Sequence, residues 1–150
     1  MDDESNVDEP KYVNNGKGIV TDNETTLMWM EQDTWQMETR WVTWDEARDF
    51  QLLMGQTKHA GYNDWRLPTL EEALSLVAPE SNNKDKYEKP IFLDPVFPEG
   101  CLATFWCEDG VGQDGYIVNL NTGKKSLLYK SKSGRMAARL VRGTPVGLGD

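Results

Sequence analysis

The stretch from Gly61 to Leu74 constrains the fold more than any other part of the chain, because it joins a turn, an extended segment and a helix start. It reads GYNDWRLPTLEEAL. Pro68 fixes its own φ near the helical value and favours an extended conformation for the residue before it. Thr69 and Glu72 have the spacing of a capping box, in which the two side chains satisfy free amide groups of the first helical turn. We therefore predict a sharp corner that leads into a helix.

The charged residues of this corner admit two interpretations. Asp64 and Arg66 lie two residues apart, so on an extended segment their side chains point to the same face. They could contact a ligand, or they could form an ion pair or carboxylate-to-backbone hydrogen bonds that hold the corner. We favour a structural role for the whole corner, whose residues are Asp64, Trp65, Arg66, Pro68, Thr69 and Glu72.

A chain of 150 residues is long enough for one domain with a single core. Residues 1–10 hold five acids, a proline and little apolar content, so we expect a mobile acidic tail there. Residues 144–150 are expected to form a second flexible tail. A single domain is therefore predicted over residues 11–143.

Two amphipathic helices are indicated by apolar residues at three- and four-residue spacing. The first is predicted over residues 44–54, after a second capping box at Thr43 and Glu46. The second is predicted to begin after Thr69 and to end at Pro79. Short segments bounded by turn residues predict strands at 12–13, 18–21, 27–30, 103–106, 116–120, 126–129 and 137–142.

Two irregular segments are expected between these elements. The residues between Glu31 and Trp41 are polar apart from Trp35 and Met37, which predicts a loop and an exposed Trp35. The segment from Glu80 to Gly100 is polar and interrupted by prolines, and loops of this length are often functional. Trp35 is the aromatic residue that we predict to bind a ligand.

The net charge of −9 is unevenly distributed, because residues 115–150 hold seven bases and one acid. The acidic majority argues against nucleic acid as a partner. A basic cluster surrounds one predicted hairpin and consists of Lys124, Lys125, Lys130, Lys132 and Arg135. It is either a solvated face that offsets the acidic remainder or a binding site for an anionic glycan or an acidic protein.

The residues that usually carry chemistry do not form a catalytic constellation. Cys101 and Cys107 lack the paired spacing of a zinc site, and they either form a local disulfide in an exported protein or are inert thiols. The single His59 has no nucleophile motif to serve, so a surface or capping role is favoured. Residues 22–24 offer oxygen ligands for calcium but fit a hairpin turn equally well. We predict no catalytic residue, no metal and no cofactor.

A set of short motifs resembles a known family. In order, they are residues 12–16, 18–23, 27–29, Trp44 with Ala47, 61–69, 105–106 and 141–143. This pattern resembles the domain family named for the C-terminal domain of a bacterial collagen-like adhesin. The chain departs from the family at Thr26, where Gly is usual, and at Cys107-Glu108, where a pair of small hydroxyl residues usually follows Trp.

The resemblance implies an α+β domain of C-type-lectin-like fold, in which two helices pack on a twisted, mainly antiparallel sheet with long loops. Family members are mostly exported or envelope proteins, and the founding adhesin domain binds sulfated polysaccharides. We therefore expect a non-enzymatic recognition domain for a glycan or surface protein at the cell envelope or outside the cell, with a cytoplasmic location as the alternative. A structural subunit of a larger complex is a second possibility.

The same helix entry is also similar to that of formylglycine-generating oxidases, which share the broader fold. Those enzymes bind copper through a cysteine pair. Cys101 and Cys107 are the available cysteines here, but they do not reproduce the enzymes' local motif. An oxidase is therefore a minor alternative, since fold does not carry function.

Overall fold

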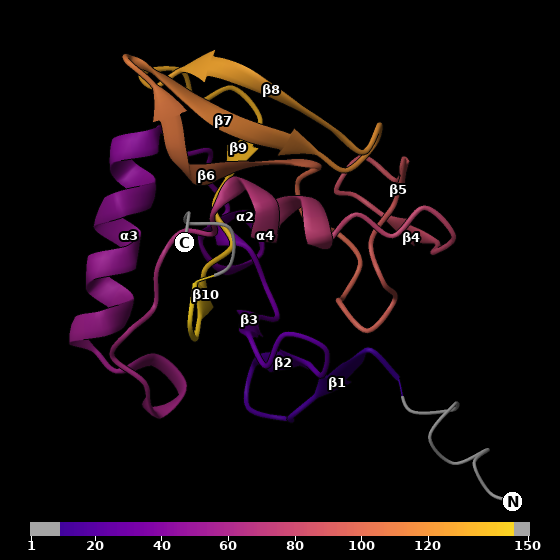
Figure 1. Cartoon of the computed structure of the whole chain (residues 1–150). Helices are drawn as coiled ribbons and strands as arrows, with labels where there is room; N and C mark the ends of the chain where they lie inside the picture. Colours follow the sequence, from indigo (N-terminus) through magenta and orange to yellow (C-terminus); the bar gives the residue numbers. More distant parts are fainter. Residues whose placement is uncertain (1–9, 146–150) are drawn as a thin grey trace, which may run out of the picture.

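Two four-stranded sheets and three α-helices make up the computed structural model, which describes residues 10–145 (Figure 1). The helices are α2 (Thr34–Glu38), α3 (Trp44–Gln56) and α4 (Leu70–Ser75), and a short 3-10 helix, η1, spans His59–Gly61. The described residues thus form a mixed α+β domain. The tails predicted at residues 1–10 and 144–150 lie outside the described residues, except for Pro10 and residues 144–145.

The first sheet is antiparallel and joins the two ends of the described chain. Its order is β1 (Tyr12–Asn14), β2 (Ile19–Asp22), β3 (Met28–Met30) and β10 (Val141–Arg142). The second sheet has the order β8 (Lys124–Tyr129), β7 (Asp114–Asn119), β6 (Thr104–Val111) and β9 (Met136–Ala137). Its β6–β9 pair is parallel and its other pairs are antiparallel. The prediction of a mainly antiparallel sheet is confirmed, but the strands divide between two sheets.

The second sheet has two differently covered faces, because side chains alternate along a strand. Phe105 pairs with Val118 on the face that packs into a buried cluster with Ala73 of α4. Thr104 pairs with Asn119 on the opposite face. Part of that opposite face is covered by a second cluster, which α3 joins through Ala47, Phe50 and Met54. The remainder of the face stays open and forms the pocket described below.

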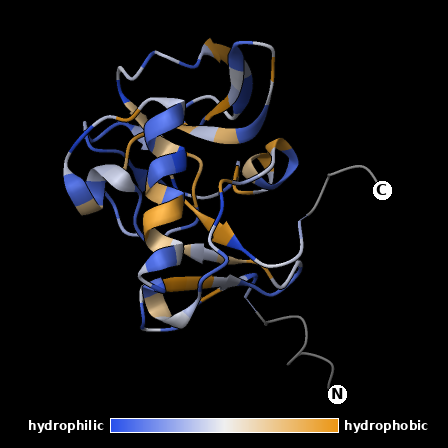
Figure 2. Ribbon diagram, turned by 90° about the vertical axis from the view of Figure 1, so that its left-hand side faces the viewer, coloured by the Kyte–Doolittle hydropathy of each residue, from blue (hydrophilic) through white to orange (hydrophobic). Residues whose placement is uncertain are grey.

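α3 borders this second cluster and exposes most of its other surface. Figure 2 shows it as a largely hydrophilic helix with one apolar turn. Ala47 and Phe50 of the helix are buried, whereas Leu52 and Leu53 are 58% and 44% exposed. Its predicted capping box is present, because Thr43 and Glu46 exchange hydrogen bonds with each other's backbone N–H. The helix runs two residues beyond the predicted end at residue 54.

The loop predicted at residues 31–41 is wrong, because α2 forms there. Asp33 caps this helix by accepting a hydrogen bond from the Gln36 N–H at 2.9 Å, and Gln36 returns a bond to the Asp33 N–H. α2 is only five residues long, so its sequence shows no apolar periodicity from which a helix could be predicted. Residues 10–145 therefore contain three α-helices, where two were predicted.

Three other boundaries also differ from the prediction. α4 ends at Ser75, well before Pro79, with its cap at Leu76. The last predicted strand, residues 137–142, divides into β9 and β10, which belong to different sheets. The long segment after Pro79 contains a two-stranded ladder, β4 (Asn83–Lys84) with β5 (Pro90–Ile91). These differences arise from tertiary pairing, which a single strand's sequence does not show.

Candidate functional site

The corner at residues 64–72 is a structural joint. Arg66 donates to both carboxylate oxygens of Glu72 at 2.8 and 2.9 Å, and the Glu72 side chain is fully buried. Glu72 Oε1 also accepts from the Thr69 N–H, and Thr69 Oγ1 accepts from the Glu72 N–H. The predicted capping box is therefore present, and it is joined to a buried ion pair.

Asp64 and Trp65 attach the corner to other elements. Asp64 accepts two hydrogen bonds from the guanidinium of Arg142 in β10, at 2.7 and 3.0 Å. The Trp65 indole is buried and donates from Nε1 to the backbone carbonyl of His59. The Arg142 guanidinium holds the pKa of Asp64 below its usual value by hydrogen bonding. The structural role of these residues fits the geometry.

An ion pair between Asp64 and Arg66 is not formed, so the ion-pair form of the structural interpretation is wrong. Asp64 instead pairs with Arg142, and Arg66 pairs with Glu72. Arg66 also forms an isolated β-bridge with Val141. The corner is therefore held by a long-range contact to β10 and by the Arg66–Glu72 pair within the corner.

The basic residues of the predicted cluster are spread over several surfaces. Lys130 lies 4.1 Å from the centroid of the Trp44 ring, and Lys125 lies 5.7 Å from the centroid of Tyr116. Lys124 and Lys132 are exposed. Of the five, Arg135 is the residue that lines a pocket. Of the predicted cluster, Arg135 is thus the residue that a ligand in this pocket can contact.

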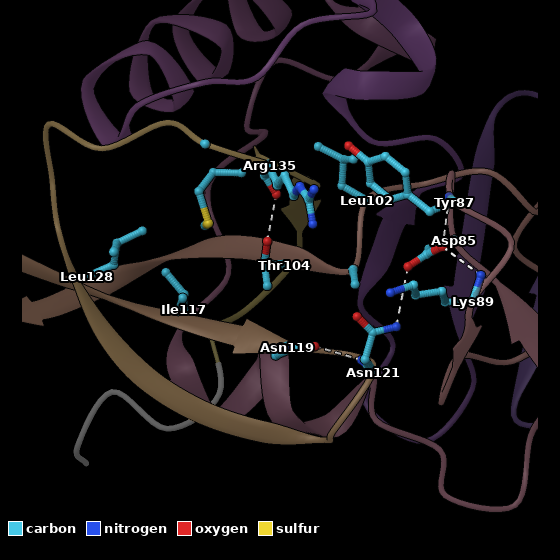
Figure 3. A pocket seen from close by; sticks show the side chains of 13 residues that line it. Asp85, Tyr87, Lys89, Leu102, Thr104, Ile117, Asn119, Asn121, Leu128 and Arg135 are labelled. Carbon is cyan, nitrogen blue, oxygen red and sulfur yellow. Dashed lines mark hydrogen bonds between the residues drawn. The ribbon is translucent and has the colours of Figure 1, made fainter.

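A cavity of about 410 Å³ opens on the uncovered face of the second sheet (Figure 3). Its floor comes from the sheet and is apolar where Ile117 and Leu128 lie, with Met136 beside them. Its walls are the turn at residues 85–89 and the loop at residues 130–135, which connects β8 to β9. The polar residues around it are Asp85, Thr104, Asn119 and Asn121, and the charged or aromatic rim is Tyr87, Lys89 and Arg135.

Asp85 organises the turn on one side of the cavity. Its side chain is buried, and Oδ1 accepts from the backbone N–H groups of Tyr87 and Lys89 at 2.8 and 2.9 Å. Oδ2 accepts from Asn121 Nδ2 at 3.3 Å. Asn121 Nδ2 also donates to the carbonyl of Pro90 at 2.9 Å. This network fixes the turn against the end of β7 and gives both carboxylate oxygens of Asp85 a donor within the protein.

Arg135 approaches the cavity from the opposite wall. Its guanidinium Cζ lies 5.0 Å from the centroid of the Tyr87 ring, and its carbonyl accepts from the Thr104 hydroxyl at 2.7 Å. Lys86 Nζ lies 5.1 Å from the same Tyr87 ring and 4.8 Å from the ring of Trp35. Cation–π contacts therefore connect Trp35, through Lys86 and Tyr87, to Arg135. Trp35 is half-buried and does not line the pocket.

Asp85, Tyr87, Lys89, Asn119 and Asn121 were not predicted as site residues. The available signal was the long loop after Pro79, which we expected to be functional and which supplies the first three. The two asparagines lie at the end of β7 and in the turn that follows it, where Asn is ordinarily explained by turn geometry. The tertiary structure, and not the local sequence, places these two asparagines beside the loop.

The remaining candidates have structural surroundings. Cys101 and Cys107 are free and buried, so a disulfide is not formed; burial raises the pKa of Cys101 to about 11 and that of Cys107 further. Asp22 is buried and accepts hydrogen bonds from the Glu24 and Thr25 N–H groups. These bonds fit the interpretation of residues 22–24 as a hairpin turn, which was the alternative to a calcium site. Between residues 10 and 145, no three potential metal ligands gather in one group. No helix in that range is long and apolar enough to cross a membrane.

Fold and pocket together define a small α+β domain with a preformed polar pocket on a sheet face. The family described as the Lcl C-terminal domain matches residues 18–142, so the chain belongs to this family. A search of curated proteins found no match.

Proposed function

We propose that this chain is a non-enzymatic recognition domain of C-type-lectin-like fold that binds a glycan or a surface protein at the bacterial cell envelope. The observation that carries the proposal is the pocket, in which fixed polar groups surround an apolar floor. Such a combination is typical of ligand sites, because apolar surface supplies affinity and a few oriented polar groups supply specificity. Family membership supports the fold assignment.

The location at the envelope rests on the resemblance to exported proteins, and the cytoplasm is its alternative. The oxidase alternative gains no support from the cysteines. Copper binding uses thiolates, whereas burial raises the pKa of both Cys101 and Cys107 and so favours the protonated thiols. A recognition function uses neither cysteine.

The proposal is tested by obstructing the pocket without disturbing the backbone. Gly134 lines the pocket, has an ordinary φ, and a Cβ added there would have no heavy atom beyond its chain neighbours within 4 Å. Gly134→Phe is therefore expected to fold normally and to abolish binding in a glycan and surface-protein screen. Ser131→Phe, in the same loop but outside the pocket lining, is the matched control and is expected to bind like the wild type.

Unchanged binding by Gly134→Phe would contradict the assignment of function to this pocket. So would a screen in which neither glycans nor surface proteins bind the wild type. Thermal unfolding of both phenylalanine variants shows whether any loss of binding comes from misfolding.

A second candidate, a structural subunit of a larger complex, is favoured by one observation. β8 is an edge strand of the second sheet, and its Leu127 and Tyr129 are 43% and 49% exposed. Open edges can pair with a strand from another protein, although flanking lysines such as Lys125 oppose this. Light scattering and a pull-down from native membranes test the candidate. A monomer that retains no protein partner contradicts it.

A further inference from the structure

We propose that the pocket binds a carboxylated sugar, and that Arg135 and Lys89 hold its carboxylate. This inference rests on the proposed function, because it names the ligand class for the same pocket. Some polar groups of the pocket already form hydrogen bonds within the protein, and the others remain available to a ligand.

The charges left for a ligand are positive. Among residues 10–145, neither the Arg135 guanidinium nor the Lys89 ammonium has a carboxylate within salt-bridge distance or a hydrogen-bond acceptor. The carboxylate of Asp85, the pocket's acid, is bound by two backbone N–H groups and one amide. Figure 3 shows the Lys89 and Arg135 side chains reaching into the space between Asp85 and Thr104. An anionic group there would meet two cations and one carboxylate, Asp85, so the charges of the pocket lining leave a net positive charge for a ligand.

Arg135 is held in a way that suits a planar anion. Its φ is +59°, its carbonyl accepts a hydrogen bond from the Thr104 hydroxyl, and its guanidinium Cζ lies 5.0 Å from the centroid of the Tyr87 ring. A guanidinium presents parallel N–H groups that match the two oxygens of a carboxylate. The Lys89 ammonium would add a positive charge that does not require one particular orientation of the anion. The pair therefore offers a carboxylate two parallel N–H donors and a second positive charge.

The amides at the end of β7 leave one donor beside one acceptor. Asn119 Oδ1 accepts from the Asn121 N–H at 2.8 Å, which orients its Nδ2 as a free donor. Asn121 Nδ2 donates to Asp85 and Pro90, which orients its Oδ1 as a free acceptor. In the described residues neither free atom has a hydrogen-bond partner. Neighbouring hydroxyls of a sugar each donate and accept, so they complement this arrangement.

The apolar floor completes the match to a sugar ring. Ile117, Leu128 and Met136 offer aliphatic surface for the C–H face of a pyranose. A cavity of about 410 Å³ holds about one or two sugar rings. A hexuronate unit combines all three features, namely a carboxylate, neighbouring hydroxyls and a C–H face.

The test compares uronate oligosaccharides with their carboxyl-reduced counterparts by titration calorimetry at fixed salt. The uronate form is expected to bind at least about 10-fold more tightly, since charge-assisted hydrogen bonds are worth that much or more. Arg135→Gln is expected to weaken uronate binding by about 10- to 100-fold and to leave binding of the reduced form unchanged. Arg135→Lys should fall between the wild type and Arg135→Gln. Lys132→Gln, a change of the same charge outside the pocket, is the control and should stay within about twofold.

Two results overturn the inference while the recognition function stands. One is equal binding of the uronate and the carboxyl-reduced form. The other is a sulfated, carboxyl-free oligosaccharide that binds as tightly as the uronate and responds equally to Arg135→Gln. If no oligosaccharide binds and Gly134→Phe blocks a surface protein instead, the inference fails and the protein-binding form of the proposed function stands. If nothing binds, both fail.

Discussion

Thr26 adopts a φ of +65° in the turn between β2 and β3, a conformation that β-branched residues rarely occupy. The family usually has Gly at this position, and the backbone shows why. Thr26→Gly is expected to remove the strain but to increase the entropy of the unfolded chain, for a net stabilisation of about 0.5–1 kcal/mol. Urea unfolding followed by tryptophan fluorescence measures the difference.

The neighbouring Thr25 provides the control for this prediction. It does not have a positive φ, and its hydroxyl accepts from the Leu27 N–H at 3.2 Å. Thr25→Gly should therefore lower the free energy of unfolding. If Thr26→Gly is no more stable than the wild type, the left-handed turn is not a source of strain.

His59 offers a second test at the scale of one residue. Burial lowers its pKa below the ordinary value of 6.5, and its ring lies edge-on to Trp65 with centroids 5.7 Å apart. The unfolded chain thus binds a proton at higher pH than the folded protein does. Stability from this group is present above about pH 6.5 and is lost as the pH falls through 6.5 toward the folded pKa.

Because the chain has one histidine, its imidazole proton resonance reports this pKa directly in an NMR titration. We expect a midpoint below 6.5, and His59→Gln should lessen the loss of stability between about pH 7 and pH 5.5. A midpoint at or above 6.5 would mean that the imidazole is not desolvated by the corner.

At the scale of elements, two ion pairs near the corner differ in burial and should differ in energy. Glu72 is fully buried in its side chain, whereas the Asp64 side chain is 50% exposed. Glu72→Gln keeps the oxygen that caps α4 but leaves the Arg66 guanidinium without its counter-charge. We expect it to lower the free energy of unfolding by about 3 kcal/mol, and Asp64→Asn by less than about 1 kcal/mol.

Chemical denaturation of both variants beside the wild type checks this order. Equal losses would indicate that the Glu72 pair is hydrated or that the Asp64 pair carries more of the connection to β10. The double variant should depart from additive losses, since Arg66 of one pair also acts electrostatically on Asp64 of the other.

Elements with local signals were predictable from the sequence. The capping boxes at Thr43 and Thr69 fixed where α3 and α4 begin, because both depend on residues three apart. α2 was missed because one turn leaves no apolar period to detect. The division of the last strand into β9 and β10 was missed because it depends on which sheet each half joins.

At the scale of the whole molecule, the pocket shows where prediction from sequence stopped. The loop after Pro79 and the basic C-terminal region were both identified as functional candidates. Which of their side chains meet could not be deduced, because Tyr87 and Arg135 are brought together by the second sheet. The clustering of basic residues along the sequence predicted five residues that bind a ligand. In the fold, one of them, Arg135, shares the pocket with Lys89, which is not a member of that sequence cluster.

The central claim is that the molecule recognises its ligand in this pocket. The most direct measurement is an amide chemical-shift map recorded while a ligand from the binding screen is titrated into the protein. We expect the shifts to concentrate at residues 85–89, 117–121 and 134–136, and Gly134→Phe to remove them. Shifts confined to the outer face of α3 or to the exposed side of β8, with the pocket unchanged, would contradict it.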